Sequence, residues 1–151
     1  MDAPKKHYYE PMHTAEHILN QKMVRMFGCG RSRNAHIERK KSKCDYLLPD
    51  APSEAQVKAI AEQVNAVIDA HLPVTVDFVP KEEATNFVDL SKLPEDAGNT
   101  VRVVRVGDYD ACACIGMHVN NTSEIGKFVI LSHDYQDGIW RVRFKLEQTE
   151  E

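Results

Sequence analysis

Two segments of the chain place apolar residues three or four positions apart, which is the spacing of an amphipathic helix. The first segment covers residues 12–27 and is followed by Gly28 and Gly30, and glycine is common just beyond a helix C-terminus. The second begins at Ser53, which has a glutamine three residues later as in a capping box, and closes at residues 71–73. The pattern therefore predicts two long helices.

Alternating or β-branched positions predict strands in the rest of the chain. The stretch from Ala35 to Leu48 has the pattern of a hairpin with a charged turn at residues 39–43. Further strands are predicted at Val74 to Val79, Val101 to Val106, Lys127 to Ser132 and Ile139 to Leu146. A helical turn is expected at residues 82–87 and a loop at residues 94–98. These elements predict a mixed α+β fold in which two long helices pack on one face of a mostly antiparallel sheet.

The composition is that of an ordinary globular domain. The chain has 151 residues, of which 42% are hydrophobic and 28% are charged, so we expect one domain covering residues 1–151. The first residues contain no apolar signal segment and no stretch has the length of a membrane span, so we expect a cytoplasmic protein. The four cysteines are therefore expected to be reduced, which leaves metal binding as an alternative role.

Positive charge is concentrated in one stretch although the net charge is −4. This local excess could form a surface that grips a polyanion, or it could be an ordinary solvated face. The candidate contacts in and beside the predicted hairpin are Arg31, Arg33, Arg39, Lys40, Lys41 and Lys43.

Two pairs of metal-binding side chains stand four residues apart. His13 and His17 lie on the first predicted helix, so both imidazoles are on one face. Cys114 and His118 form the second pair, after a strand. Nitrogen and thiolate ligands are the ligands that zinc prefers, and a thiolate argues against magnesium or calcium. Four protein ligands are typical of a structural zinc site, so catalysis would require a fifth position or one loosely held ligand.

Six blocks of the sequence resemble, in the same order, the editing domain of alanyl-tRNA synthetase and its small free-standing relatives. These blocks are HisThrAlaGluHis at 13–17, ValAsnAlaValIle at 64–68, LeuProVal at 72–74, ValArgValValArgValGlyAsp at 101–108, CysIleGlyMetHisVal at 114–119 and ThrSerGluIleGly at 122–126. The editing domain of threonyl-tRNA synthetase is related.

The resemblance implies a zinc-dependent deacylase that acts in trans. Its substrate would be a mischarged tRNA, seryl- or glycyl-tRNA for alanine above all, bound through the acceptor stem and the 3′ aminoacyl end. The implied zinc ligands are His13, His17, Cys114 and His118. The basic stretch would then contact tRNA. Which amino acid is removed, which tRNA is bound and whether the chain forms oligomers stay open at this point.

Three departures from the family pattern bear on the substrate preference. The segment CysIleGlyMetHis at 114–118 replaces CysGlyGlyThrHis and so lacks one glycine and one hydroxyl. Ser32, Asn34 and Ala35 stand where the family has a glutamine and a GlySer pair. The segment LysCysAspTyr at 43–46 replaces ArgPheAspPhe and keeps both a positive charge and an acid.

Two residues beside the predicted ligands are candidates for catalysis. Glu16 is either a general base next to His17 or a surface carboxylate, because it lies about 100° around the helix from that histidine. Thr14 is either a polar wall of the substrate pocket, which the resemblance favours, or a helix residue bonded to its own turn. Cys112 is either a spare ligand or a small buried residue.

Two other functions fit parts of the pattern. HisThrAlaGluHis matches the H-x-x-E-H motif of a class of metallopeptidases, although such an enzyme would bring a carboxylate rather than Cys114 as a further ligand. A zinc-stapled RNA-binding module without catalysis would use the metal only to tie the helix to the sheet.

Overall fold

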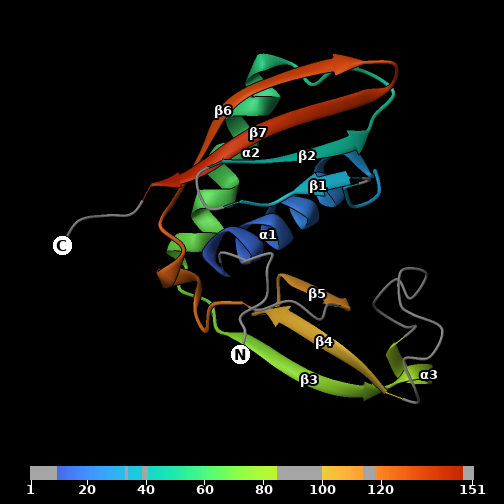
Figure 1. Cartoon of the computed structure of the whole chain (residues 1–151), viewed down its shortest axis with the longest axis vertical. Helices are drawn as coiled ribbons and strands as arrows, with labels where there is room; N and C mark the ends of the chain where they lie inside the picture. The colour runs from blue at the N-terminus through green and yellow to red at the C-terminus, as the bar shows by residue number, and fades with distance from the viewer. Residues whose placement is uncertain (1–9, 33, 39–40, 85–99, 114–117, 148–151) are drawn as a thin grey trace.

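The computed structural model describes residues 10–32, 34–38, 41–84, 100–113 and 118–147, and it contains two long helices and two antiparallel sheets (Figure 1). The helical elements are α1 (Glu10–Phe27), α2 (Glu54–Asp69), the short α3 (Lys81–Ala84) and the 3-10 helix η2 (Thr122–Glu124). The strands are β1 (Asn34–His36), β2 (Ser42–Leu47), β3 (Val74–Pro80), β4 (Thr100–Val106), β5 (Asp110–Ala113), β6 (Lys127–Gln136) and β7 (Ile139–Glu147). The predicted α+β class is confirmed.

Helix α1 ends where the glycine pattern predicts. Gly28 has a φ of 70°, and its N–H donates to the carbonyl of Val24 at 2.9 Å, which is the usual left-handed cap. Nine of the 18 residues of α1 are buried, and these nine include polar as well as apolar side chains. A helix buried to this extent needs cover on more than one side.

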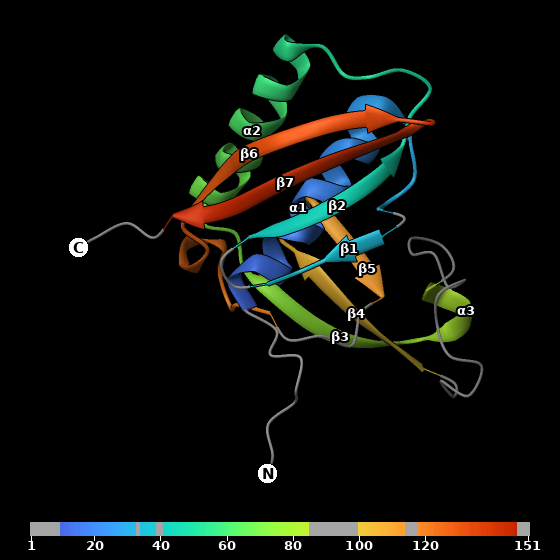
Figure 2. The same ribbon diagram turned by 45° about the horizontal axis from the view of Figure 1, so that its top comes forward.

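Helix α2 begins with the capping box that the sequence predicts. The Ser53 hydroxyl accepts from the Gln56 N–H at 3.1 Å, and the Gln56 side chain accepts from the Ser53 N–H at 2.8 Å. Ile60, Val64 and Ile68 form its buried stripe. Figure 2 shows that α1 and α2 lie on the same face of the four-stranded sheet.

The four-stranded sheet has the order β1-β2-β7-β6, with antiparallel pairing throughout. The predicted hairpin corresponds to β1 and β2, although β2 already begins at Ser42. Asp137 and Gly138 join β6 to β7 with φ values of 55° and 82°, as a two-residue hairpin turn requires. Strand β6 extends to Gln136, four residues beyond the predicted end, because it pairs with β7 up to this turn.

The remaining strands form a separate three-stranded sheet with the order β3-β4-β5. The sequence predicts one sheet, and the structure divides it in two because α1 lies between the sheets and is covered by both (Figure 1). The helical turn expected at residues 82–87 begins in α3, and its last residues lie outside the described part of the chain, as does the loop at 94–98. None of the described helices is long and apolar enough to cross a membrane.

Candidate metal centre

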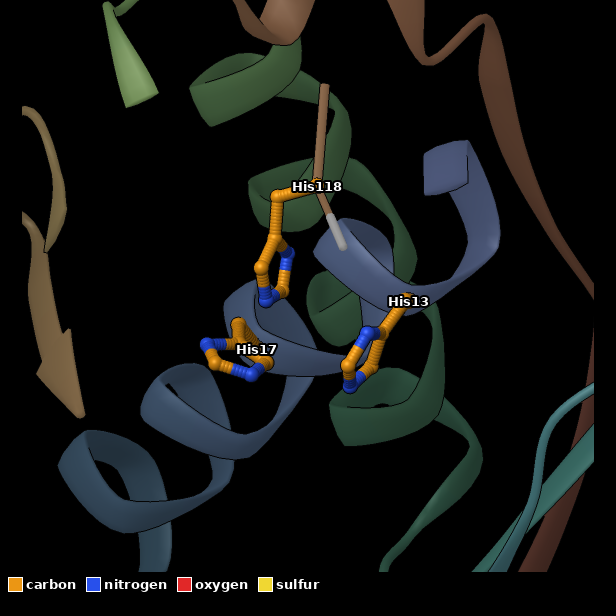
Figure 3. Close-up of side chains that lie close together, drawn as sticks. All are labelled: His13, His17 and His118. Carbon is orange, nitrogen blue, oxygen red and sulfur yellow. The ribbon is translucent and has the colours of Figure 1, made fainter. Parts of the chain in front are cut away.

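Three histidine side chains converge between α1 and the segment that follows β5. His13 and His17 project from successive turns of α1, and His118 comes from the other side, so the three rings point toward one another (Figure 3). The ligand nitrogens of the three rings all lie within 4.8 Å of one another. In the described residues, this is the group of side chains with the geometry of a metal site.

The rings pack closely enough for one ion to reach all three. The centroids of His13 and His118 are 4.4 Å apart with nearly parallel planes, and the centroids of His17 and His118 are also 4.4 Å apart with planes at 71°. Zinc–nitrogen bonds of about 2.0–2.1 Å place two ligand nitrogens of a tetrahedral site roughly 3.4 Å apart. Small side-chain rotations bring the three nitrogens to that spacing.

The surroundings favour the neutral form of two of the three imidazoles, those of His17 and His118. Burial lowers the pKa of His17 well below its usual value, and the adjacent His118, Arg31 and His13 lower it further. Burial and then the charges of His13 and Arg102 lower the pKa of His118 to about 3. A neutral imidazole has a nitrogen lone pair to give to a metal, so the site is in the protonation state that a metal requires.

Thr14 holds the ring of His118. The Thr14 Oγ1 atom is fully buried and lies 2.9 Å from His118 Nδ1, and it also accepts a hydrogen bond from the Val119 N–H at 3.3 Å. When His118 Nδ1 donates its proton to this oxygen, the lone pair is on Nε2, where a metal can bind. The threonine thus bonds to a segment more than 100 residues away in sequence, and not only to its own helical turn.

A buried carboxylate stands behind His17. The Asp110 side chain is fully buried, and its Oδ2 lies 3.7 Å from His17 Nδ1. It accepts hydrogen bonds from Gln21 at 2.8 Å and from both terminal nitrogens of Arg31 at 3.0 and 3.2 Å. A carboxylate that orients a ligating histidine is a recurrent feature of metal sites. Asp110 was not among the predicted site residues, although counting back in twos through the sequence from Cys114 reaches it.

The residues present fit a zinc ion. His17 Nδ1 is buried without a hydrogen-bond partner. Leaving a buried polar atom unpaired costs free energy, so such an atom often belongs to a binding or catalytic site. A slight approach to Asp110 would satisfy Nδ1 and leave Nε2 for the metal. The fourth predicted ligand, Cys114, lies outside the described residues together with the rest of the 114–117 segment.

Glu16 lies beside the histidine cluster. Its Oε1 is 3.8 Å from His13 Nε2, and its side chain is only 13% exposed. The carboxylate therefore does not project into solvent, as a surface residue would. Cys112 is half-buried in β5 and is not one of the three residues that form the ligand group.

The predicted basic contacts occupy different environments. Arg31 is largely buried and forms its ion pair with Asp110, whereas Lys41 and Lys43 are exposed at the hairpin. The other predicted contacts, Arg33, Arg39 and Lys40, lie outside the described residues.

Ser32, one of the positions that depart from the family pattern, is buried near α1. Its N–H donates to the Asn20 side-chain oxygen at 3.2 Å, and this oxygen also accepts from the Tyr46 hydroxyl at 2.6 Å. Ala35, another such position, is exposed.

Comparisons with known proteins place the chain beside the tRNA synthetases. Residues 101–143 match the family model of the threonyl and alanyl tRNA synthetase second additional domain. The chain is 31% identical over 137 residues, 89% of its length, to an alanine–tRNA ligase of Treponema denticola, and 34% identical over 121 residues, 80% of its length, to that of Bacillus subtilis. It spans only 23% and 14% of these two ligases. The predicted resemblance is confirmed: the chain is related to the alanine–tRNA ligases over most of its length, and its residues 101–143 match the second additional domain of the threonyl and alanyl tRNA synthetases.

Proposed function

We propose that this chain hydrolyses the ester bond of a mischarged aminoacyl-tRNA, with a zinc ion held by His13, His17, Cys114 and His118. The observation that carries the proposal is the convergence of three imidazoles from two distant segments. The similarity to alanine–tRNA ligases over most of the chain supports the choice of substrate class.

The protonation state and the positions of the histidine rings suit metal binding before any substrate is present. A zinc ion bound there would supply Lewis-acid activation of the ester carbonyl and of water. Burial keeps His17 and His118 unprotonated, because it lowers the pKa of both rings. Thr14 holds the ring of His118 through a hydrogen bond, and Asp110 lies 3.7 Å from His17 Nδ1, where a small movement would let it orient that ring as well.

Glu16 is our candidate for the general base. Its carboxylate is close to the cluster and almost screened from solvent, so it can accept a proton from an attacking water and return it to the leaving ribose hydroxyl. The alternative, a carboxylate that only orients His13, predicts that Glu16→Gln weakens metal binding. A general base predicts instead that Glu16→Gln retains the metal and loses turnover.

We propose serine or glycine as the amino acid removed from alanine tRNA, with the chain acting in trans. Thr14 is the candidate that distinguishes serine from alanine, because a buried hydrogen-bonding group is left unpaired by a substrate that lacks the hydroxyl. Its oxygen already has two partners, one of which is His118. A Thr14→Val variant therefore separates the two roles: loss of selectivity indicates recognition, and loss of zinc alone indicates support of His118.

We propose that the basic hairpin holds the acceptor stem of the tRNA. Lys41 and Lys43 are exposed, and Lys43 lies directly opposite Arg143 on the neighbouring strand. Arg143 is paired with Asp134, and Arg31 is paired with Asp110. Lys41 and Lys43 are therefore better candidates for phosphate binding than the two paired arginines. Arg33, Arg39 and Lys40 are further candidates from the sequence.

One experiment separates the proposal from its two rivals. The purified chain is incubated with seryl, glycyl and alanyl esters of alanine tRNA and with a set of small peptides, with and without a chelator. A deacylase releases serine or glycine and stops when the metal is removed. A metallopeptidase cleaves the peptides, and a zinc-stapled RNA-binding module binds the tRNA but releases no amino acid, so either result would reject the proposal.

A further inference from the structure

An exposed aromatic ring stands on the same side of the small sheet as the histidine cluster. Phe78, in β3, is 69% exposed, the most exposed of the large hydrophobic residues in the described chain. Its neighbour two positions back, Val76, is 41% exposed. Exposed apolar side chains that lie together on one face can mark a binding surface, and Val76 and Phe78 form such a pair on β3.

The strand register fixes the direction in which Phe78 faces. Val104 and Val106 pack in the main core with α1, whereas Val101 and Val103 form a separate cluster on the opposite face of β4. Arg102 alternates with this second pair and therefore faces the α1 side. Phe78 is the direct partner of Arg102 across the β3–β4 ladder, so the ring lies on the α1 side too.

Arg102 connects this ring to the candidate metal centre. Its guanidinium is close enough to His118 to be one of the charges that lower the pKa of this histidine. Arg102 therefore lies directly opposite Phe78 on the strand ladder and also acts electrostatically on His118. In Figure 1, β3 forms an edge of the small sheet, and the 69% exposure of Phe78 leaves much of its ring accessible to a ligand.

We propose that Phe78 is the stacking platform for the 3′-terminal base of the RNA substrate, and that Arg102 takes a phosphate of the same single-stranded end. This inference rests on the proposed function, because the scissile ester is on the ribose of that terminal nucleotide. Its base must then lie one sugar away from the reacting carbonyl. An aromatic ring and an adjacent cation are the pair of groups that hold single-stranded nucleic acid.

The chemistry of the ring fits a substrate end that is the same in every tRNA. Phenylalanine has no hydrogen-bonding group, so it binds the face of a base and does not read its edges. The platform therefore contributes affinity and position, and discrimination between tRNAs lies elsewhere. A second copy of this chain packed on Phe78 is the competing occupant, and it predicts self-association.

The first test measures binding without hydrolysis. A Phe78→Trp variant is titrated with the trinucleotide cytidine-cytidine-adenosine and with the same molecule ending in an abasic ribose. Leu131→Trp is the matched control, because Leu131 is 45% exposed on β6, in the other sheet. We expect fluorescence quenching only for the Phe78→Trp variant and only with the complete trinucleotide. Equal responses of the two ligands would overturn the proposal.

The second test measures kinetics on seryl-tRNA. Phe78→Ala and Phe78→Leu should raise KM about ten-fold, as expected for the loss of one base–aromatic stack, while Phe78→Tyr and the control Leu131→Ala keep the wild-type value. Arg102→Gln should reduce the slope of log affinity against log salt by about one, and Arg102→Lys should restore it. An unchanged KM in Phe78→Ala contradicts the platform while leaving the proposed hydrolysis intact.

Two further outcomes are decisive. If the wild-type chain hydrolyses no aminoacyl-tRNA, the proposed function fails, and the trinucleotide titration still decides whether Phe78 binds a base. If sedimentation shows a dimer of the wild-type chain that Phe78→Ala dissociates, the ring is an interface between copies and the nucleotide proposal is overturned.

Discussion

The two sheets of this protein use the same helix in opposite ways. The four-stranded sheet contributes large, fully buried rings such as Trp140, Phe128 and Phe144 to the main core, which it shares with α1 and α2. The three-stranded sheet presents the buried carboxylate of Asp110, the guanidinium of Arg102 and the exposed ring of Phe78. Stability is therefore concentrated on one side of α1 and chemistry on the other.

The strongest test of this division makes the same substitution in both sheets. Phe144→Ala removes a fully buried ring and should lower the free energy of unfolding by about 3–5 kcal/mol. Phe78→Ala removes an exposed ring and should change it by less than about 0.5 kcal/mol. Chemical denaturation of both variants gives the comparison. Similar losses in the two proteins would show that the small sheet contributes to stability as much as the large one.

The next prediction concerns two carboxylates, one in each sheet, that each receive two hydrogen bonds from an arginine. Asp110→Asn should weaken zinc binding about 10- to 100-fold, the usual effect of losing a carboxylate that orients a ligating histidine. Asp45→Asn should leave zinc binding unchanged, because Asp45 pairs with Arg141 in the four-stranded sheet. Competition with a chelator measures both affinities. Equal weakening in the two variants would mean that the effect is on folding in general.

A smaller effect is expected at the hairpin of the four-stranded sheet. Replacing Lys41 and Lys43 with alanine should raise KM for tRNA and reduce the salt slope by up to about two, with turnover and zinc content retained. Leu47→Ala on the same strand is the control, because Leu47 is exposed and uncharged. Kinetics at several salt concentrations provide the slope. A slope equal to that of the wild type would place the acceptor stem elsewhere on the chain.

The smallest predicted effect is a pH dependence that originates in the four-stranded sheet. Hydrogen bonds from Arg141 lower the pKa of Asp45 below its usual value near 3.8. The folded state then binds fewer protons than the unfolded state, so this pair stabilises the protein above about pH 4 and ceases to do so as pH falls through the lowered pKa. Asp45→Asn should reduce stability at neutral pH and converge with the wild type in acid. Denaturation at a series of pH values measures this difference, and a constant difference would contradict it.

Local signals in the sequence predicted the elements that carry the site. The four-residue spacing of His13 and His17, the glycine after α1 and the capping box at Ser53 each depend on neighbouring residues only, and the structure confirms each of them. The hairpin turn at Asp137 and Gly138 belongs to the same class. The meeting of the first histidine pair with His118 required the resemblance to a known family as well.

The parts that the sequence did not predict depend on contacts between distant segments. Asp110 is 79 residues from Arg31 in the chain, and neither residue has a partner at a recognisable spacing. Arg31 was accordingly predicted as a tRNA contact within the basic stretch, whereas in the structure it is partly buried and forms an ion pair with Asp110. The division of the strands into two sheets has the same origin, because it follows from the burial of α1 on more than one side.

Elemental analysis of the purified chain tests most directly the proposal that His13, His17 and His118 hold one zinc ion. The wild-type protein should contain close to one zinc per chain, and His17→Ala, His13→Ala and Cys114→Ala should each contain much less while keeping their helical content. The Leu131→Ala variant should match the wild type. Full zinc occupancy in both histidine variants would contradict the account.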